Sequence, residues 1–389
     1  MRKLLCLVLM FIMIFSIPNV TSIRAKINEG NLHILEVQRT QAEKIHSFGE
    51  FYNENINNDD FIKSYSGVYF ESSNLIISVV RDYSKTFMKT YDLDFQHEIN
   101  FVKYSMIQLE EFEEYISTMS TDLKLLETSI DVRGNKVNVK TELTIEEFLS
   151  NIDKKFDPSI VSVHNSVYEI DYKVNRTDNG ERFSVGTVQC TVGFAVEDNN
   201  NDAGFVTAGH CMENSGASNG TNVYYDSSHA GDVDGGWHFE DGDVDGGFVE
   251  LRYPLLGTKW LPSHNLVFGG SYFAVGTFSS FFVPGTIVNF HGTFGPNGTV
   301  NTTVDSGEIL NGSINVYNDQ NQLMYTNMVS TDIETQNGDS GGPLTITIYI
   351  GEGCYETNVL GILSFTYNDD SYYSKASDIL DVLNLDEYS

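Results

Sequence analysis

The chain has 389 residues, a length typical of two or three domains. Its 23 basic and 54 acidic residues give a net charge of −31, which argues against nucleic acid as a partner because phosphate binding needs clustered lysine and arginine. Hydrophobic residues make up 41% of the chain, enough for folded cores, so a wholly disordered protein is excluded. The single long apolar run lies at the N-terminus, which excludes a protein that crosses a membrane several times.

Residues 1–22 have the pattern of a secretory signal peptide. Arg2 and Lys3 precede an almost unbroken hydrophobic stretch from Leu4 to Ile17, and small residues allow cleavage after Ser22. A bilayer span needs roughly 20 apolar residues, more than this stretch offers, so removal is favoured over an uncleaved anchor. We therefore expect the protein to be secreted.

The first 176 residues hold 19 basic and 26 acidic residues, nearly balanced in charge, and residues 23–176 have mixed α and β patterns. The apolar positions of Ile107–Ile116 approximate one face of a helix, and strand-like runs occur at 67–70, 75–80 and 137–140. An α+β segment is predicted here.

From Thr177 onward the chain has only 4 basic but 28 acidic residues, and glycine, serine, threonine and asparagine become frequent. Short β-branched and aromatic runs are separated by turn residues, a pattern typical of an all-β barrel or sandwich. These runs are Gly186–Val196, Val244–Leu251, Thr286–His291, Leu344–Ile350 and Val359–Phe365. Only the tail, Ala376–Leu385, has a helical pattern.

Two motifs in this second part carry nucleophilic chemistry. In Gly338-Asp-Ser-Gly-Gly-Pro343, glycines flank a serine and allow a tight turn that presents backbone amides beside its hydroxyl. A serine needs a base to become a nucleophile, and Thr207-Ala-Gly-His-Cys211 supplies a histidine 130 residues earlier.

With these motifs the chain resembles the chymotrypsin-like serine proteases, and within them the bacterial streptogrisin and α-lytic protease branch. The resemblance extends over Cys190–Phe194, Phe205–Cys211, Val359–Ser364 and Tyr372–Leu383, and more weakly over Tyr65–Val80, Phe101–Tyr115 and Ile130–Val139. It implies that residues 177–389 form two antiparallel six-stranded β-barrels with a C-terminal helix. It also implies that residues 23–176 form an α+β pro-region that assists folding and inhibits the enzyme.

The resemblance implies a triad in which Ser340 attacks, His210 acts as the base and an aspartate orients His210. Asp245 fits the family pattern because Gly-Gly-Phe-Val follows it. Asp243 and Asp234 remain alternatives, since residues 231–236 nearly repeat residues 242–247. The amides of Gly338 and Ser340 are expected to hold the oxyanion.

By the same resemblance, three segments surround the bound substrate, and backbone groups of residues 364–366 pair with it as an added strand. The expected substrate-binding residues are Asp332, Glu334, Leu363, Ser364, Phe365, Thr366, Ser371 and Tyr373. Leu363 stands where glutamate-specific members have a histidine, which argues against glutamate specificity. Two hypotheses remain: an apolar pocket lined by Leu363, Phe365 and Tyr373, or a pocket in which Asp332 or Glu334 selects arginine and lysine.

Three cysteines follow the predicted signal, and counting alone does not settle their pairing. The resemblance implies a Cys190–Cys211 disulfide, which leaves Cys354 as a free thiol or as the partner of another molecule. It also places the start of the mature enzyme near Arg176, so we expect cleavage after Arg176, with Arg182 as the second choice.

No metal or cofactor is expected in the site. Asp241–Gly246 resembles the start of a calcium loop, but the twelfth position is Arg252, so an EF-hand is excluded; a looser calcium site and plain solvated turns both remain open. The expected partners are a peptide or protein substrate and the chain's own pro-region, without nucleic acid and without a membrane after signal removal, in a monomer. The rival function is an inactive homologue kept as a binding or adhesion module; an esterase is weaker because no strand–turn–helix nucleophile elbow is present.

Overall fold

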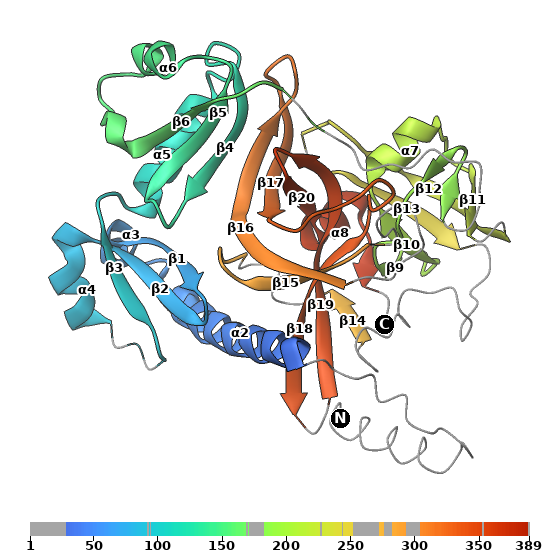
Figure 1. Ribbon diagram of the computed structural model, residues 1–389, viewed down its shortest axis with the longest axis horizontal. Coiled ribbons are helices and arrows are strands. Elements are labelled where there is room, and N and C mark those ends of the chain that lie inside the picture. Colours follow the sequence, from blue (N-terminus) through green and yellow to red (C-terminus); the bar gives the residue numbers. More distant parts are fainter. Residues whose placement is uncertain are drawn as a thin grey trace.

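A computed structural model describes residues 29–91, 93, 95–168, 170, 183–225, 228–242, 244–251, 272–275, 282–292, 304–351 and 354–387. The predicted signal peptide, both predicted cleavage positions and Asp243 lie outside these residues. Within them no helix is long and apolar enough to cross a membrane. The chain is mostly β-sheet with a few helices (Figure 1).

The N-terminal segment, residues 29–170 as described, mixes helices and strands. Its helices are α2 (Glu29–Asn55), α3 (Asp59–Ser64), α4 (Ser84–Thr90), α5 (Met106–Ser117) and α6 (Ile145–Asn151), with short 3₁₀ turns at Arg81–Tyr83 and Pro158–Ile160. Its strands are β1 (Tyr65–Glu71), β2 (Asn74–Val80), β3 (Glu98–Val102), β4 (Leu125–Asp131), β5 (Lys136–Thr141) and β6 (Val161–Asn165). The predicted helix at 107–116 and the three predicted strands are confirmed as α5, β1, β2 and β5.

In the C-terminal segment, the described residues from 183 onward form strands and two short helices. The strands before residue 252 are β7 (Ser184–Val185), β8 (Val188–Gln189), β9 (Ala195–Glu197), β10 (Ala203–Thr207), β11 (Asn222–Tyr225), β12 (Ser228–His238) and β13 (Gly246–Leu251). Later strands are β14 (Tyr272–Val275), β15 (Ile287–His291), β16 (Val304–Tyr317), β17 (Leu323–Thr331), β18 (Pro343–Gly351), β19 (Cys354–Tyr367), β20 (Asp370–Lys375) and β21 (Asp386–Glu387). The helices are α7 (Gly209–Ser215) and α8 (Ala376–Leu383).

The structure modifies two of the sequence-based expectations for this segment. The run Gly186–Val196 does not form one strand: it begins in the turn before β8, where Gly186 has a φ of 56°, and residues 190–194 separate β8 from β9. The C-terminal helix ends at Leu383, two residues earlier than predicted, because Asn384 takes the left-handed conformation that caps it.

Two sheets organise the C-terminal segment. One has eight strands in the order β21-β9-β10-β13-β12-β11-β7-β8. In the other, β15, β18, β19, β20, β17 and β16 pair in that order, and an additional β15–β16 pairing joins the ends into a closed ring. This second sheet continues beyond β16 into β4, β5 and β6 of the N-terminal segment.

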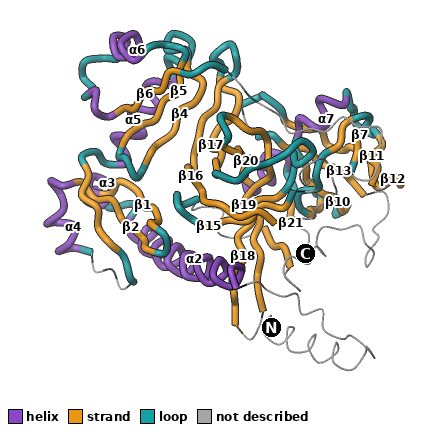
Figure 2. The backbone as a smooth tube through the Cα atoms, viewed as in Figure 1, coloured by secondary structure: helices purple, strands orange, loops and turns teal. Residues whose placement is uncertain are grey.

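The two segments are therefore joined by a shared sheet. Ile314, Asn315 and Val316 of β16 lie opposite Ser129, Thr128 and Glu127 of β4, and Figure 1 shows β4 beside the long β16. The N-terminal helix α2 forms a second contact, because it runs against β15 and β18 (Figure 2).

The α2 contact is made by buried polar side chains. Gln41 Nε2 donates to the carbonyl of Gly285 at 2.9 Å, and its Oε1 accepts from the backbone N–H of Ile287 at 2.8 Å. Next to it Val283, 3% exposed, packs in a core cluster whose other members all come from the N-terminal segment, including Phe48 and Phe70. The C-terminal segment thus contributes a side chain to the hydrophobic core of the N-terminal segment.

Glu113 of α5 lies beside Tyr317 of β16 near this shared sheet, and burial raises the pKa of Glu113 from 4.5 to about 7. A carboxyl with a higher pKa in the folded than in the unfolded state binds protons on folding. Its unfavourable contribution therefore develops as the pH rises from 4.5 to 7 and persists above pH 7. We expect Glu113→Gln to raise the thermal unfolding midpoint at pH 8 and to leave it unchanged at pH 4, measured by differential scanning fluorimetry.

Glu114→Gln is the matched control, because Glu114 is exposed on the same helix. It should change the midpoint little at either pH. A gain for Glu113→Gln that is equal at pH 4 and pH 8 would contradict the assignment.

Candidate active site

The two motifs and Asp245 meet at one point. His210 Nδ1 lies 2.7 Å from Asp245 Oδ2, and His210 Nε2 lies 2.8 Å from Ser340 Oγ. The backbone N–H of His210 donates to Asp245 Oδ1 at 2.8 Å. All three side chains are 0% exposed, so these hydrogen bonds lie in a water-excluded site where they are electrostatically strong.

Adjacent strands of the eight-stranded sheet bring His210 and Asp245 together. Thr207, at the end of β10, pairs with Gly247 of β13. His210 follows on the first turn of α7, and Asp245 lies just before β13. Gly209 is required at the start of α7, because a Cβ there would lie 2.0 Å from the backbone oxygen of His238.

Ser340 comes from the turn before β18, and residue Thr191 ties this turn to the other sheet. The N–H of Thr191 donates to the Ser340 carbonyl at 2.8 Å, and its Oγ1 donates to the Gly338 carbonyl, also at 2.8 Å. Gly341 has a φ of +84°, and a Cβ on it would lie 2.3 Å from Thr207 Oγ1. The glycine is therefore needed both for its conformation and for the close approach of the two sheets.

The turn leaves two amides available beside the Ser340 hydroxyl. Gly338 has a φ of +98°. Within the described part of the chain, neither the Gly338 nor the Ser340 N–H donates to a protein acceptor. Paired amides of this kind can donate hydrogen bonds to a negatively charged oxygen that develops at a carbon bonded to Ser340 Oγ.

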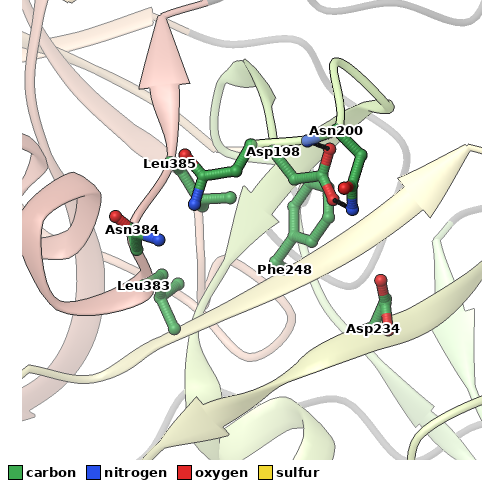
Figure 3. A pocket seen from close by; sticks show the side chains of 8 residues that line it. Asp198, Asn200, Asp234, Phe248, Leu383, Asn384 and Leu385 are labelled. Atoms are coloured by element: carbon green, nitrogen blue, oxygen red, sulfur yellow. Dashed lines mark hydrogen bonds between the residues drawn. The ribbon is translucent and has the colours of Figure 1, made fainter.

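Two alternatives for the aspartate were open from the sequence. Asp234 lies on β12 opposite Phe248 and lines a small cavity of about 160 Å³, with Asp198, Asn200 and Leu385 among the other lining residues (Figure 3). It makes no described contact with His210. Asp243 lies outside the described residues, so the geometry favours Asp245.

The residues expected to bind substrate lie on the hairpin of β19 and β20 and on the segment before Ser340. Leu363 and Tyr373 are 0% exposed and pack in one apolar cluster with residues such as Val329 and Leu344. Phe365 is stacked between Tyr325 and Tyr372, with ring centroids 5.8 and 4.9 Å away. All three side chains are therefore core residues of this hairpin.

The two acids proposed for a basic pocket have a different environment. Asp332 and Glu334 are both exposed. Asp332 Oδ1 accepts a hydrogen bond from the backbone N–H of Glu308 at 2.7 Å, on β16. Ser371 is buried, and its Oγ donates to the Ile333 carbonyl at 2.7 Å. The Ser371 hydroxyl therefore binds the backbone between the two acids, whereas the carboxylates of Asp332 and Glu334 stay exposed to solvent.

The cysteine pair implied by the resemblance is present: Cys190 and Cys211 form a disulfide next to His210. Cys190, His210 and Cys211 have ligand atoms within 4.8 Å of one another, but sulfurs in a disulfide are not the thiolates that bind a metal.

The acidic surface near the site is explained by turns and local pairs. Asp198 accepts hydrogen bonds from Asn200 and from the N–H of Asp202, and Asp241 pairs with His238 at 2.5 Å. Burial, followed by the charges of Asp202, Asp234 and their neighbours, raises the pKa of Glu250.

Sequence reasoning missed two polar residues of the site. Thr191 supports the Ser340 turn, and Ser374 of β20 accepts the backbone N–H of Asp245 at 2.9 Å. Both lie in segments that carry the resemblance, but a serine or threonine within a strand has no sequence signature that separates it from ordinary sheet residues.

No protein-family model and no curated protein matches the chain. Among solved structures, the Nocardiopsis protease NAPase matches at 24% identity and a TM-score of 0.38, over 54% of this chain and 98% of that one. Protease A of Thermobifida fusca matches at 22% identity and a TM-score of 0.37, over 54% and 96%. An alpha-lytic protease homologue also matches, at 15% identity and a TM-score of 0.35, over 54% and 97%. All three are named as proteases or as a protease homologue.

Proposed function

We propose that the protein is a secreted serine endopeptidase of the chymotrypsin type, made as a zymogen. One observation carries the proposal. Hydrogen bonds link Asp245 through His210 to Ser340, and beside Ser340 the glycine-rich turn has two backbone N–H groups with no acceptor among the described residues. We assign the closed ring of β15, β18, β19, β20, β17 and β16 to one barrel of such a protease and the eight-stranded sheet to the other.

In this mechanism Ser340 Oγ attacks the carbonyl carbon of the scissile peptide, and its proton passes to His210 Nε2. The N–H groups of Gly338 and Ser340 donate to the oxyanion of the tetrahedral intermediate. His210 then gives the proton to the leaving amine, and an acyl ester on Ser340 remains. Water, deprotonated by His210, hydrolyses the ester and restores Ser340. Asp245 holds the imidazole with Nε2 facing Ser340 throughout.

We expect a peptidyl phosphonate to modify Ser340 stoichiometrically, measured by intact mass, and Ser340→Ala to remove this labelling. Asp245→Asn should lower the turnover of a peptide substrate by about 10⁴-fold, because it disturbs the orientation and charge of His210. Asp234→Asn is the matched control and should leave turnover within about 2-fold, since Asp234 does not contact His210.

Equal losses for the two aspartates would refute the choice of Asp245. Absence of labelling in the intact, folded protein would favour the alternative function, an inactive homologue that acts as a secreted binding module.

We further propose that residues 23–176 are the pro-region and residues 177–389 the protease. Support comes from the contacts of the N-terminal segment with β20. Tyr372 OH donates to Glu127 Oε2 at 2.6 Å, and Lys140 Nζ lies 2.8 Å from the same oxygen. Because Tyr372 lies between Ser371 and Tyr373, the N-terminal segment is bound directly to the strand that is expected to line the substrate site.

The mature protein is expected to begin at Thr177, with a start at Phe183 as the second choice. An intact mass of the secreted product would give this terminus together with the thiol state: one disulfide and a reduced or intermolecularly paired Cys354. A start before residue 165 or after residue 190 would contradict this boundary.

For the primary specificity we propose an apolar pocket, but not one walled by the side chains of Leu363, Phe365 and Tyr373, because these are packed in the core. This choice is supported by the two acids: Asp332 and Glu334 are exposed, and Asp332 is bonded to the backbone N–H of Glu308. A solvated carboxylate does not select a basic side chain in a buried pocket. Profiling on a peptide library should show cleavage after Phe, Tyr or Leu. The profile should be unchanged in Asp332→Ala and Glu334→Ala. Cleavage after Arg or Lys that either substitution abolishes would overturn the apolar pocket.

A further inference from the structure

Asp245 has one anchor in the described structure that does not involve His210. Its two carboxylate oxygens both contact His210, one at the imidazole and one at the backbone N–H. Its own backbone N–H donates to Ser374 Oγ at 2.9 Å. The hydroxyl of Ser374 therefore connects Asp245 to the second sheet, which also carries Ser340.

Ser374 is held in turn by a second hydroxyl. Its Oγ lies 3.1 Å from the Oγ of Ser364 on β19, and both residues are almost fully buried, at 2% and 0% exposure. In the β19–β20 register Leu363 pairs with Tyr373 and Phe365 with Tyr372, so Ser364 is an extra residue with no opposite partner. Such a bulge re-aims a side chain, and here it allows the Ser364 hydroxyl to reach Ser374.

This hydroxyl pair links two parts of the site. Ser364 begins the stretch of β19 whose backbone is expected to pair with substrate, and Ser374 holds the backbone of Asp245. A buried N–H that loses its acceptor is costly, so the chain at Asp245 would shift to find another partner. Any shift of Asp245 rotates the imidazole that it orients, and small misplacements of this kind lower the rate of the chemical step.

We infer that Ser374 is a positioning residue for the triad: through its hydrogen bonds to the Asp245 backbone and to Ser364, it fixes the carboxylate that orients His210. The inference rests on the proposed protease function, since it concerns the same site. It assigns no contact with substrate to Ser374.

The test is a double-mutant cycle between Ser374→Ala and Asp245→Asn, with kcat and KM measured on one peptide substrate. In the otherwise natural protein, Ser374→Ala should lower kcat on the order of 10-fold and leave KM nearly unchanged. In the Asp245→Asn background the same substitution should have little further effect, because the carboxylate through which it acts has already been removed.

Two further variants separate positioning from general destabilisation. Ser374→Thr keeps a hydroxyl and should restore most of kcat. Ser377→Ala is the control: among the described residues the Ser377 hydroxyl bonds its neighbour Asp378 on α8, away from the triad, so this substitution should leave kcat unchanged.

The inference is overturned if Ser374→Ala lowers kcat equally in both backgrounds, or if it changes only the thermal midpoint. A readout independent of activity keeps this result separate from failure of the proposed function. The low-field proton resonance between His210 and Asp245, identified by its loss in His210→Ala, should shift in Ser374→Ala and not in Ser377→Ala. If the phosphonate does not label Ser340 but the resonance shifts in Ser374→Ala, the protease function is refuted while the positioning role of Ser374 stands. If the resonance does not shift in Ser374→Ala, the positioning role is refuted.

Discussion

A single imidazole, hydrogen-bonded through both of its nitrogens, sets the requirements for the rest of the structure. His210 must lie within about 3 Å of a carboxylate on one side and a hydroxyl on the other, while water is excluded from all three. His210 and Asp245 lie next to the ends of adjacent strands of one sheet, β10 and β13, whereas Ser340 lies in a turn of the other sheet. The site therefore exists only where the two sheets are brought together, and its geometry depends on their contact.

That contact combines apolar packing, in which Val206 and Phe248 meet Val359 and Ile362, with polar and backbone groups at close range. Thr191 binds the Ser340 turn through both its N–H and its hydroxyl, while Gly341 lies too near Thr207 to carry a side chain. Hydrogen bonds between main-chain groups have narrow geometry, so they hold the turn more exactly than apolar packing would. Ser374 extends the same principle to Asp245, since a strand of the second sheet receives the backbone N–H of a residue from the first.

The N-terminal segment bears on the same second sheet from two directions. Its strand β4 extends the sheet at β16, and its helix α2 binds the Gly285–Ile287 backbone with Gln41. The C-terminal segment has a large excess of acidic residues, and two of the cations that approach it, Lys140 and Arg133, belong to the N-terminal segment. Sheet pairing, a core side chain and charge all favour association of the two segments in this chain.

The sequence by itself predicted the chemistry and much of the local structure. The motif Gly338–Pro343 and the histidine at 210 predicted a nucleophile, a base and an oxyanion turn, because those residue types have few other uses in that arrangement. The periodicity of residues 107–116 and of the short β runs predicted elements that the structure contains. What the sequence left open depended on contacts between residues far apart in the chain. The sequence already favoured Asp245 over its near-copy Asp234, but only the tertiary structure placed Asp245 against His210, left Asp332 and Glu334 exposed, and brought Ser374 to Asp245. These outcomes follow from sheet register and from how two sheets meet, and a one-residue change in register reverses the face on which a side chain lies, so no local pattern encodes them.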